Sequence, residues 1–453
     1  MSSFSQLISN VKKARAAFNR GRSRSDAKRN NQSQSRYSVL PSTLSSTSVY
    51  AFLLVPKFDA ECARPCYSVA NVTASVEQVN LIPTSSPWDL LPVELQIKIF
   101  AHCGVADFLP LKLVCRAFCQ ILNSQEHWIT RQYLRQRRHG TLPSPINSER
   151  TYSRHPEDDV VLLSDLFPPI TSAKGGHLYT FRYIHSLRRR QKLCSKLCYF
   201  LADRVIDRFM RSEPGFVKSM FPSRNERNDF QKRAVGVIWF YLTPLMYYTL
   251  YFIETYALAR REQTNALLRD YEAGRLPVKI PPDVRKSLYR DLQVQIIRSP
   301  PFTDTATLVS THHCMQLLVS YLQHTVAPDE PGPSDDSWIG SLLTVSPFMR
   351  VLEYFSAEIG DGGSQRMQRK EFMHNFHNDI TSNEKDDMNS RVFECAPHIH
   401  VHGSMQDVWF DVATQEVMSR GATTHKPELV PVMDGLPVIF GCQFCRDSAG
   451  WRA

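Results

Sequence analysis

The chain has 453 residues, of which 42% are hydrophobic and 22% charged, a composition typical of a globular protein with two or three folded units. Its formal net charge is +10. Residues 1–36 hold nine Lys or Arg and one acid, so they account for +8 of this charge. The rest of the chain is nearly neutral, which gives no reason to expect a nucleic-acid-binding surface on the folded part.

Residues 1–84 are expected to form a largely disordered, basic tail. Residues 1–48 are rich in Ser, Asn, Gln and Arg and poor in large apolar side chains. Such a segment cannot bury enough surface to offset the entropy lost on folding. Two other interpretations stay open: a nuclear-import or nucleic-acid contact through Arg20–Arg24, and a mitochondrial presequence over the first 18 residues.

The eleven cysteines do not follow a disulfide spacing, and no signal peptide with an uninterrupted apolar core opens the chain. Some of them lie within helical apolar patterns, where a free thiol packs as a small hydrophobe. We therefore expect a reducing compartment, the cytoplasm, the nucleus or both.

Residues 87–134 predict a set of short helices. Asp89 is a candidate N-cap, Pro92 falls in a first turn, and Gly104 can end the first helix. Asp107 can cap a second helix, in which Pro110 again falls in the first turn.

The expected second helix, residues 108–122, is apolar around most of its circumference. Its polar positions Lys112, Arg116 and Gln120 recur every four residues and form one narrow stripe. Such a helix must be buried on most sides, yet a unit of about 50 residues is too small to cover it. Either the rest of the chain or a partner covers it.

An ordered set of residues in this segment resembles the F-box motif. Its members are Leu91, Pro92, Glu94, Leu95, Ile99, Phe100, Asp107, Leu109, Leu113, Val114, Cys115, Arg116, Phe118, Leu122 and Trp128. The resemblance implies a trihelical unit at about 85–134 that docks on a Skp-type adaptor, which in turn binds a cullin scaffold. By the same resemblance, the contact would be made by Leu91, Pro92, Leu95, Ile99, Leu113, Val114 and Trp128. The chain departs from the family at Cys103–Val105, where a leucine and an acidic residue are common.

The remainder is expected to hold a linker at 135–160 and a helical substrate-recognition domain at 161–453. No propeller or leucine-rich repeat period occurs there. In this respect the domain resembles the helical regions that follow the motif in many fungal F-box proteins. Helices are predicted at about 178–211, 305–324, 338–357 and 365–377. We expect a solvated helix face at the basic residues Arg188–Arg190, Lys192 and Lys196. The alternative is that they bind a phosphate or an acidic segment.

Residues 234–253 carry no charge over 20 residues, which is long enough for a membrane span. Four tyrosines lie through the segment rather than in two interfacial belts, and Pro244 would kink it. We therefore predict a core helix, broken or bent at Pro244, and keep a membrane span as the alternative.

The last part of the chain changes its pattern. Residues 407–412 and 415–418 predict two short strands, hence a small β element near the C-terminus. The thiol and imidazole groups nearby could instead bind zinc. The segment, however, has no second Cys pair and no His-Glu-x-x-His motif. These ligands are Cys395, His398, His400, His402, Cys442 and Cys445. We expect no metal and no cofactor.

No phosphate-binding loop, nucleophile elbow or dinucleotide fingerprint occurs, so the sequence predicts no enzyme. The fold expected is mainly α: a trihelical F-box, then an irregular helical domain. The function expected is that of a substrate adaptor in an SCF ubiquitin ligase, acting in ubiquitin-dependent degradation, with no nucleic-acid or membrane partner. The alternative is a membrane-associated or zinc-binding protein in which the F-box-like helices are only structural.

Overall fold

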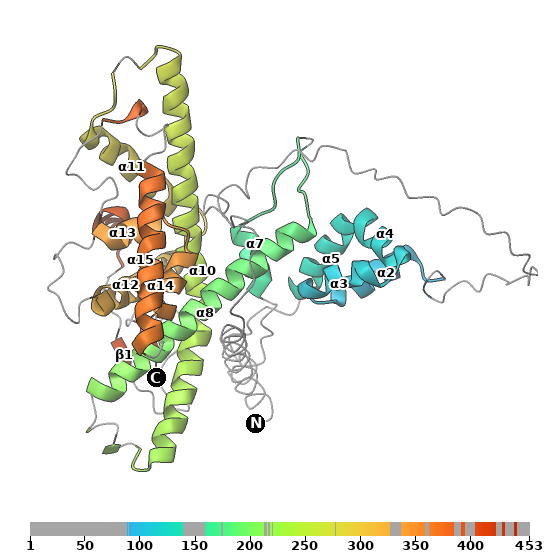
Figure 1. The fold of residues 1–453 in the computed structure, drawn as a ribbon, viewed down its shortest axis with the longest axis horizontal. Coiled ribbons are helices and arrows are strands. Elements are labelled where there is room, and N and C mark those ends of the chain that lie inside the picture. The colour runs from blue at the N-terminus through green and yellow to red at the C-terminus, as the bar shows by residue number, and fades with distance from the viewer. Residues whose placement is uncertain are drawn as a thin grey trace, which may run out of the picture. The chain divides into compact units, whose positions relative to one another are not determined.

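The computed structural model describes residues 88, 90–138, 159–173, 175–212, 215, 218–219, 221–276, 278–326, 337–357, 362–384, 391–394, 404–422, 428–430 and 439–441. The predicted basic tail, most of the predicted linker and all six candidate zinc ligands lie outside these residues. The described part is mainly helical, as predicted (Figure 1).

By its contacts the chain divides into two units, residues 1–96 with 142–155, and residues 97–141 with 156–453. In the first unit, the buried side chain of Gln96 holds the turn that leads into helix α2 (Val93–His102). Its Nε2 atom donates to the carbonyl oxygens of Trp88 and Leu91, each at 3.0 Å. These hydrogen bonds join the turn at Trp88–Leu91 to the first turn of α2.

The second unit continues with short helical elements. These are η3 (Val105–Asp107), α3 (Phe108–Val114), α4 (Arg116–Ser124) and α5 (Glu126–Arg138). The single helix predicted over 108–122 is wrong, since Cys115 has an extended backbone (φ −156°, ψ 164°) between α3 and α4. Its Sγ atom accepts the N–H of Phe118 at 3.5 Å and so caps α4. The Lys112, Arg116 and Gln120 stripe is therefore divided between two helices.

Longer helices make up the rest of the second unit. In chain order they are α7 (Asp159–Leu166), α8 (Phe181–Ser212), α10 (Arg224–Glu272), α11 (Pro282–Ile297), α12 (Thr305–Val326), α13 (Ser337–Thr344), α14 (Met349–Ala357), α15 (Gly362–Glu384), η5 (Gln406–Phe410) and α17 (Asp411–Ser419). Helix α10 packs against α7, α8, α11, α12 and α13 (Figure 1). It is thus the element around which this unit is organised.

Helix α10 begins with a capping box, in which Ser223 and Glu226 satisfy each other's backbone N–H groups. The sequence predicted a helix that is either broken or bent at Pro244. The helix continues through Pro244, so a break there is wrong. Among the described residues, α10 is the one helix long and apolar enough to cross a membrane, and 56% of its most apolar stretch is buried within the chain. A core helix of a soluble protein meets the same criterion, so this finding is weak evidence for a membrane span.

The two strands predicted at 407–412 and 415–418 are wrong. The first segment lies in the π-helix η5 and the start of α17, and the second lies in α17. Trp409 is fully buried, with its ring 4.5 Å from Phe252 and 5.7 Å from Phe302. Tertiary packing of a helix outweighed the local strand preference of these residues. Later in the chain, β1 (Glu428–Val430) pairs antiparallel with β2 (Ile439–Gly441).

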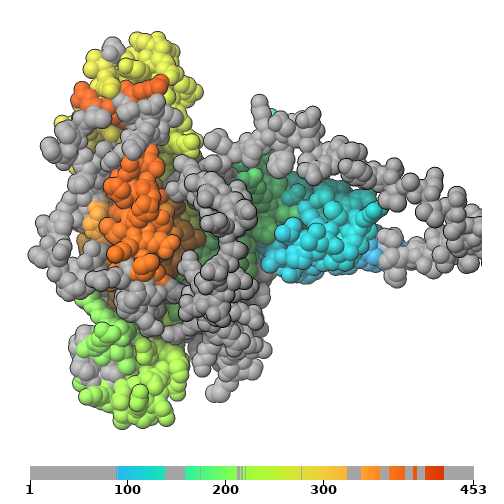
Figure 2. All heavy atoms as spheres, viewed as in Figure 1, coloured from blue at the N-terminus to red at the C-terminus, as the bar shows by residue number. Residues whose placement is uncertain are grey.

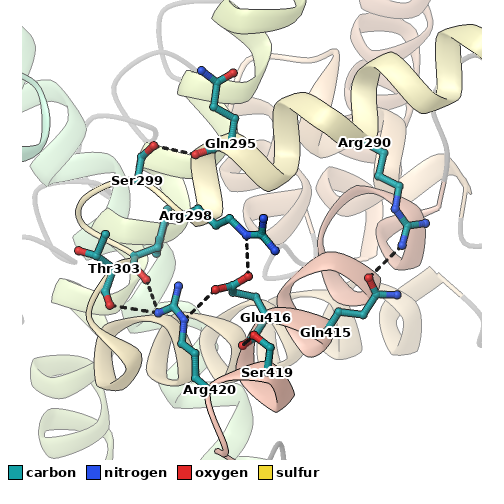
Figure 3. Close-up of polar contacts among 10 residues, drawn as sticks. Arg290, Gln295, Arg298, Ser299, Thr303, Gln415, Glu416, Ser419 and Arg420 are labelled. Atoms are coloured by element: carbon teal, nitrogen blue, oxygen red, sulfur yellow. Dashed lines mark hydrogen bonds and ion pairs between the residues drawn. The ribbon is translucent and has the colours of Figure 1, made fainter.

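A group of charged side chains attaches α17 to the end of α11 (Figure 3). Glu416 accepts from Arg298 Nε and from Arg420 Nε, both at 2.9 Å. Arg420 also donates to the carbonyl oxygens of Phe302 and Thr303, at 2.8 and 3.1 Å. The hydrogen bond from Arg298, opposed by partial burial and helped by Arg420, holds the pKa of Glu416 below its ordinary value.

Replacing Glu416 by Gln should lower the free energy of unfolding by about 1–2 kcal/mol, because the charge-assisted hydrogen bonds to Arg298 and Arg420 are weakened. The wild-type contribution is present above the pKa of an unfolded Glu and is lost as the pH falls below it. Urea denaturation of the variant measures this loss. Glu262→Gln, at an exposed position on α10, is the control and should change little. An equal effect of both changes would contradict the role of Glu416.

Candidate partner-docking surface

The short helices α2 to α5 enclose a small apolar core. Its fully buried members within the second unit are Phe100, Ala101, Val105, Phe108, Leu122, Ile129 and Tyr133. The ring of Phe100 meets Phe118 edge-on at 5.3 Å, and Phe108 meets Tyr133 at 6.3 Å. These aromatic contacts stabilise the packing beyond the area that they bury.

Polar contacts fix the connections between these helices. At the break after α2, Asp107 Oδ2 accepts the N–H of Gly104 at 3.0 Å. Arg137 of α5 donates to the carbonyl of Ala101 at 3.0 Å, and its guanidinium lies 3.5 Å from the centre of the Tyr133 ring. The departure from the F-box motif at Cys103–Val105 therefore leaves a well-connected turn.

Large apolar side chains remain exposed on α3 and α5. Leu113 is 81% exposed and Val114 is 66% exposed, directly before the break at Cys115. Leu109 lies one turn before Leu113 on α3 and is also exposed. Trp128 on α5 is 53% exposed, with Arg131 6.0 Å from its ring centre. Exposed apolar side chains are thus found on both α3 and α5.

The structure places the predicted contact residues as follows. Leu95 and Ile99 lie one turn apart on α2 and are both exposed, as is Pro92, whereas Leu91 is half-buried. The selection of these residues as adaptor contacts stays a prediction. The prediction omitted Leu90, Val93 and Leu109, which are exposed as well. Leu109 was already part of the motif, so the signal to include it was present.

The exposed apolar residues of the second unit do not have a cover within the described chain. We call Ile99, Leu109, Leu113, Val114 and Trp128 the exposed apolar set. The expectation that the rest of the chain covers the second helix holds for Phe108, which stacks on Phe181, but not for Leu113 and Val114. Figure 2 shows atoms of these short helices (cyan) at the surface on the side drawn.

The same short helices hold the first turn of α8. The carboxylate of Glu126 accepts the backbone N–H of Phe181 at 2.5 Å, and so caps a helix start that would otherwise leave this donor without a partner. The Phe181 ring stacks on Phe108 at 4.4 Å and 30°, while the Lys112 ammonium lies 5.2 Å from it. The short helix α3 is thereby connected to the long helix α8 by packed aromatic rings.

The polar and thiol groups of this region are of the kinds found in metal and nucleophile sites. Among the described residues, no three His, Cys, Asp or Glu side chains are arranged to hold a metal ion. The thiols of Cys103, Cys115 and Cys119 are free. Burial, together with the nearby Asp107 carboxylate, raises the pKa of Cys103 and keeps its thiol protonated.

A family model described as F-box-like matches residues 88–132, about a tenth of the chain. No significant match is found among curated proteins or among solved structures. Domains of this family are typically parts of non-enzymatic adaptors. The match coincides with the helices that carry the exposed apolar set. The chain is therefore a protein that contains an F-box-like domain, at residues 88–132.

Proposed function

We propose that this protein is a substrate-recognition adaptor of a cullin-type SCF ubiquitin ligase. The F-box-like domain binds a Skp-type adaptor, and residues 161–453 bind a protein destined for ubiquitin-dependent degradation. The observation that carries the proposal is the exposure of Leu113 and Val114 within the matched domain, where a folded unit would otherwise bury them. The cytoplasm or the nucleus is the location that fits this role.

The proposed role requires no catalytic group in this chain. An adaptor holds its substrate close to a catalytic subunit, so that transfer proceeds at a high effective concentration. The stacking of Phe108 on Phe181 supports this role, because it joins the F-box-like domain to α8, the first long helix of the proposed substrate-binding region.

Adaptor binding by purified proteins tests the proposal. Leu113→Ala combined with Val114→Ala removes exposed side chains and should leave the fold intact. We expect the affinity for the Skp-type adaptor to fall about 100-fold, since each truncation removes apolar surface that binding would bury. Calorimetric titration measures the change.

The matched control is Leu258→Ala with Met373→Ala, two exposed apolar positions on α10 and α15. This variant should bind the adaptor like the wild type. If the wild-type chain fails to bind the adaptor, the proposed function is wrong. If the Leu113 and Val114 variant binds like the wild type, the choice of contact residues is wrong.

The apolar stretch of α10 favours one alternative, attachment to a membrane. Against it, α10 carries polar contacts to other helices of the chain. Tyr247 donates to Asp159 at 3.0 Å, and Glu254 pairs with Arg190 at 2.7 Å. A lipid-embedded helix would have to break both contacts. Recovery of the chain in the soluble fraction without detergent would exclude this alternative.

A further inference from the structure

Residues 391–394, which we call the strap, lie between α15 and η5 in the chain and pack against the end of α10 and the start of α11. The Ile280 N–H donates to the carbonyl of Val392 at 2.9 Å, and the Glu394 N–H donates to the carbonyl of Ile280 at 3.0 Å. These two hydrogen bonds form a parallel bridge between Ile280 and Phe393. The strap thus uses both backbone groups of Ile280, in the way that a bound peptide pairs with a free strand edge.

The strap buries two adjacent apolar side chains. Val392 is 0% and Phe393 is 2% exposed, whereas Arg391 and Glu394 on either side are exposed. With Ile280 the two side chains form a small cluster of their own, in which two of the three buried members come from the strap. Departure of the strap would therefore open an apolar surface to a ligand. We call this surface the strap site; its members are Leu267, Leu268, Leu276, Ile280 and Leu288.

One position beside the strap site is built for an aromatic ring. The guanidinium of Arg285 lies 4.2 Å from the centre of the Phe393 ring and 5.3 Å from the centre of the Tyr289 ring. Arg285 Nε also donates to the Tyr289 hydroxyl at 3.2 Å, which holds the guanidinium in place. The Tyr289 and Phe393 rings meet at 66° with their centres 6.3 Å apart. A cation and a second ring at these distances favour an aromatic side chain over an aliphatic one.

The elements on both sides of the strap have attachments of their own. Helix α15 is held to α14 by the buried pair of Arg350 and Asp379, at 2.8 Å. The elements η5 and α17 are held by Trp409, whose ring lies in the core, and by Glu416, which pairs with Arg298 of α11 at 2.9 Å. The strap can therefore leave its site without detaching either neighbour.

We propose that the strap site binds a segment of the recruited substrate in which an aliphatic residue is directly followed by Phe, and that the strap occupies this site as an internal competitor. The strap itself shows which chemistry fits: a main chain that pairs with Ile280, and an aromatic ring under Arg285. The inference rests on the proposed function in identifying the partner as the substrate. An internal competitor reduces the apparent affinity in proportion to the time that it occupies the site.

Fluorescence anisotropy with a labelled peptide tests the inference on the full chain. The peptide is Asn-Ser-Arg-Val-Phe-Glu, the sequence of residues 389–394, and the control peptide has Ser in place of Val and Phe. Val392→Ser combined with Phe393→Ser gives a strap variant whose site is open. We expect the strap variant to bind the Val-Phe peptide at least about tenfold more tightly than the wild type does. The control peptide should bind the strap variant at least about tenfold more weakly than the Val-Phe peptide.

A pair of arginine substitutions in the strap variant locates the bound peptide. Arg285→Ala should weaken binding of the Val-Phe peptide about fivefold, because it removes the cation beside the Phe ring. Arg290→Ala removes the same charge from the same helix, but Arg290 lies on another face and contacts Gln415 of α17. It should change the affinity by less than about twofold.

Hydrogen exchange of the wild-type chain tests displacement without any substitution. Excess Val-Phe peptide should speed exchange of the Glu394 amide at least about tenfold, because the peptide takes its place at the Ile280 carbonyl. The Ile280 amide should stay protected, since the peptide replaces the carbonyl of Val392 as its acceptor. An unchanged Glu394 amide would show that the peptide does not displace the strap.

The affinity for the Skp-type adaptor is measured in parallel and should be equal in the wild type and the strap variant. If the peptide binds as expected but the adaptor does not bind, the proposed function fails and the strap site stands. The inference is overturned by an absence of peptide binding, by equal binding of the two peptides, by equal affinities of the wild type and the strap variant, or by equal effects of the two arginine changes. Loss of helical circular dichroism in the strap variant would also overturn it, because the strap would then be required for the fold.

Discussion

Replacing Phe108 by Ala should lower the free energy of unfolding by about 3–5 kcal/mol, the usual cost of removing a fully buried aromatic ring. Phe108 is 1% exposed and lies between Tyr133 of α5 and Phe181 of α8. The change would leave a cavity between these elements, with the Lys112 ammonium close to it. Urea denaturation of the full chain, followed by circular dichroism, measures the loss.

The neighbouring Leu109→Ala is the matched control for Phe108. Leu109 lies on the same helix but is 67% exposed, so its truncation should change the stability by less than about 0.5 kcal/mol. It should instead weaken adaptor binding. A loss below about 1 kcal/mol for Phe108→Ala would show that the F-box-like domain does not depend on its contact with α8.

The second large effect expected is a loss of stability in mild acid that depends on His312. This residue of α12 is 2% exposed, and burial, helped by the adjacent His313, lowers its pKa from 6.5 to about 4. Gln316 lies 3.0 Å from its Nε2 atom, and the Phe410 ring meets the imidazole edge-on at 5.4 Å. No hydrogen-bond partner reaches its Nδ1 atom within the described residues.

The sign of the pH effect follows from the lowered pKa. Between about pH 6.5 and 4 the unfolded chain binds a proton at His312 that the folded chain does not bind, so acid favours unfolding. The stability contributed by neutral His312 is complete above pH 6.5 and falls by about 3 kcal/mol by pH 4.

Unfolding free energies of the wild type and of His312→Gln, measured from pH 7 to 4, test this expectation. The variant should show a shallower decline with falling pH. His374→Gln, at an exposed position on α15, is the control and should follow the wild-type curve. If His312→Gln declines as steeply as the wild type, another group causes the acid sensitivity.

The helical character of the body could be predicted because its segments are long and periodic. The pattern at 178–211 corresponds to α8 (Phe181–Ser212), and that at 305–324 corresponds to α12 (Thr305–Val326). Helix α11 (Pro282–Ile297) was not among the helices predicted from the sequence. Pro282 in fact occupies the first turn, where a proline costs nothing.

The basic residues of α8 show a second limit of prediction. The charges of Arg188–Arg190 are adjacent in the sequence. Adjacent residues on a helix point in different directions, and here Arg190 is paired inside while Arg189 is exposed. The spacing of Arg182, His185, Arg189, Lys192 and Lys196 is present in the sequence, but only the structure shows that these residues are exposed while Leu187, Leu197 and Leu201 are buried.

The sequence by itself determined that residues 87–134 contain short helices of the F-box type, because local turn chemistry and an ordered apolar pattern act over a few residues. Only the tertiary structure decided which apolar residues of that segment are buried. The extended backbone at Cys115 separates two helices and exposes Leu113 and Val114, while Phe108 is enclosed by Phe181, 73 residues away in the chain. Burial depends on contacts between distant segments, and these contacts are specified by the packing of the whole unit rather than by the local sequence.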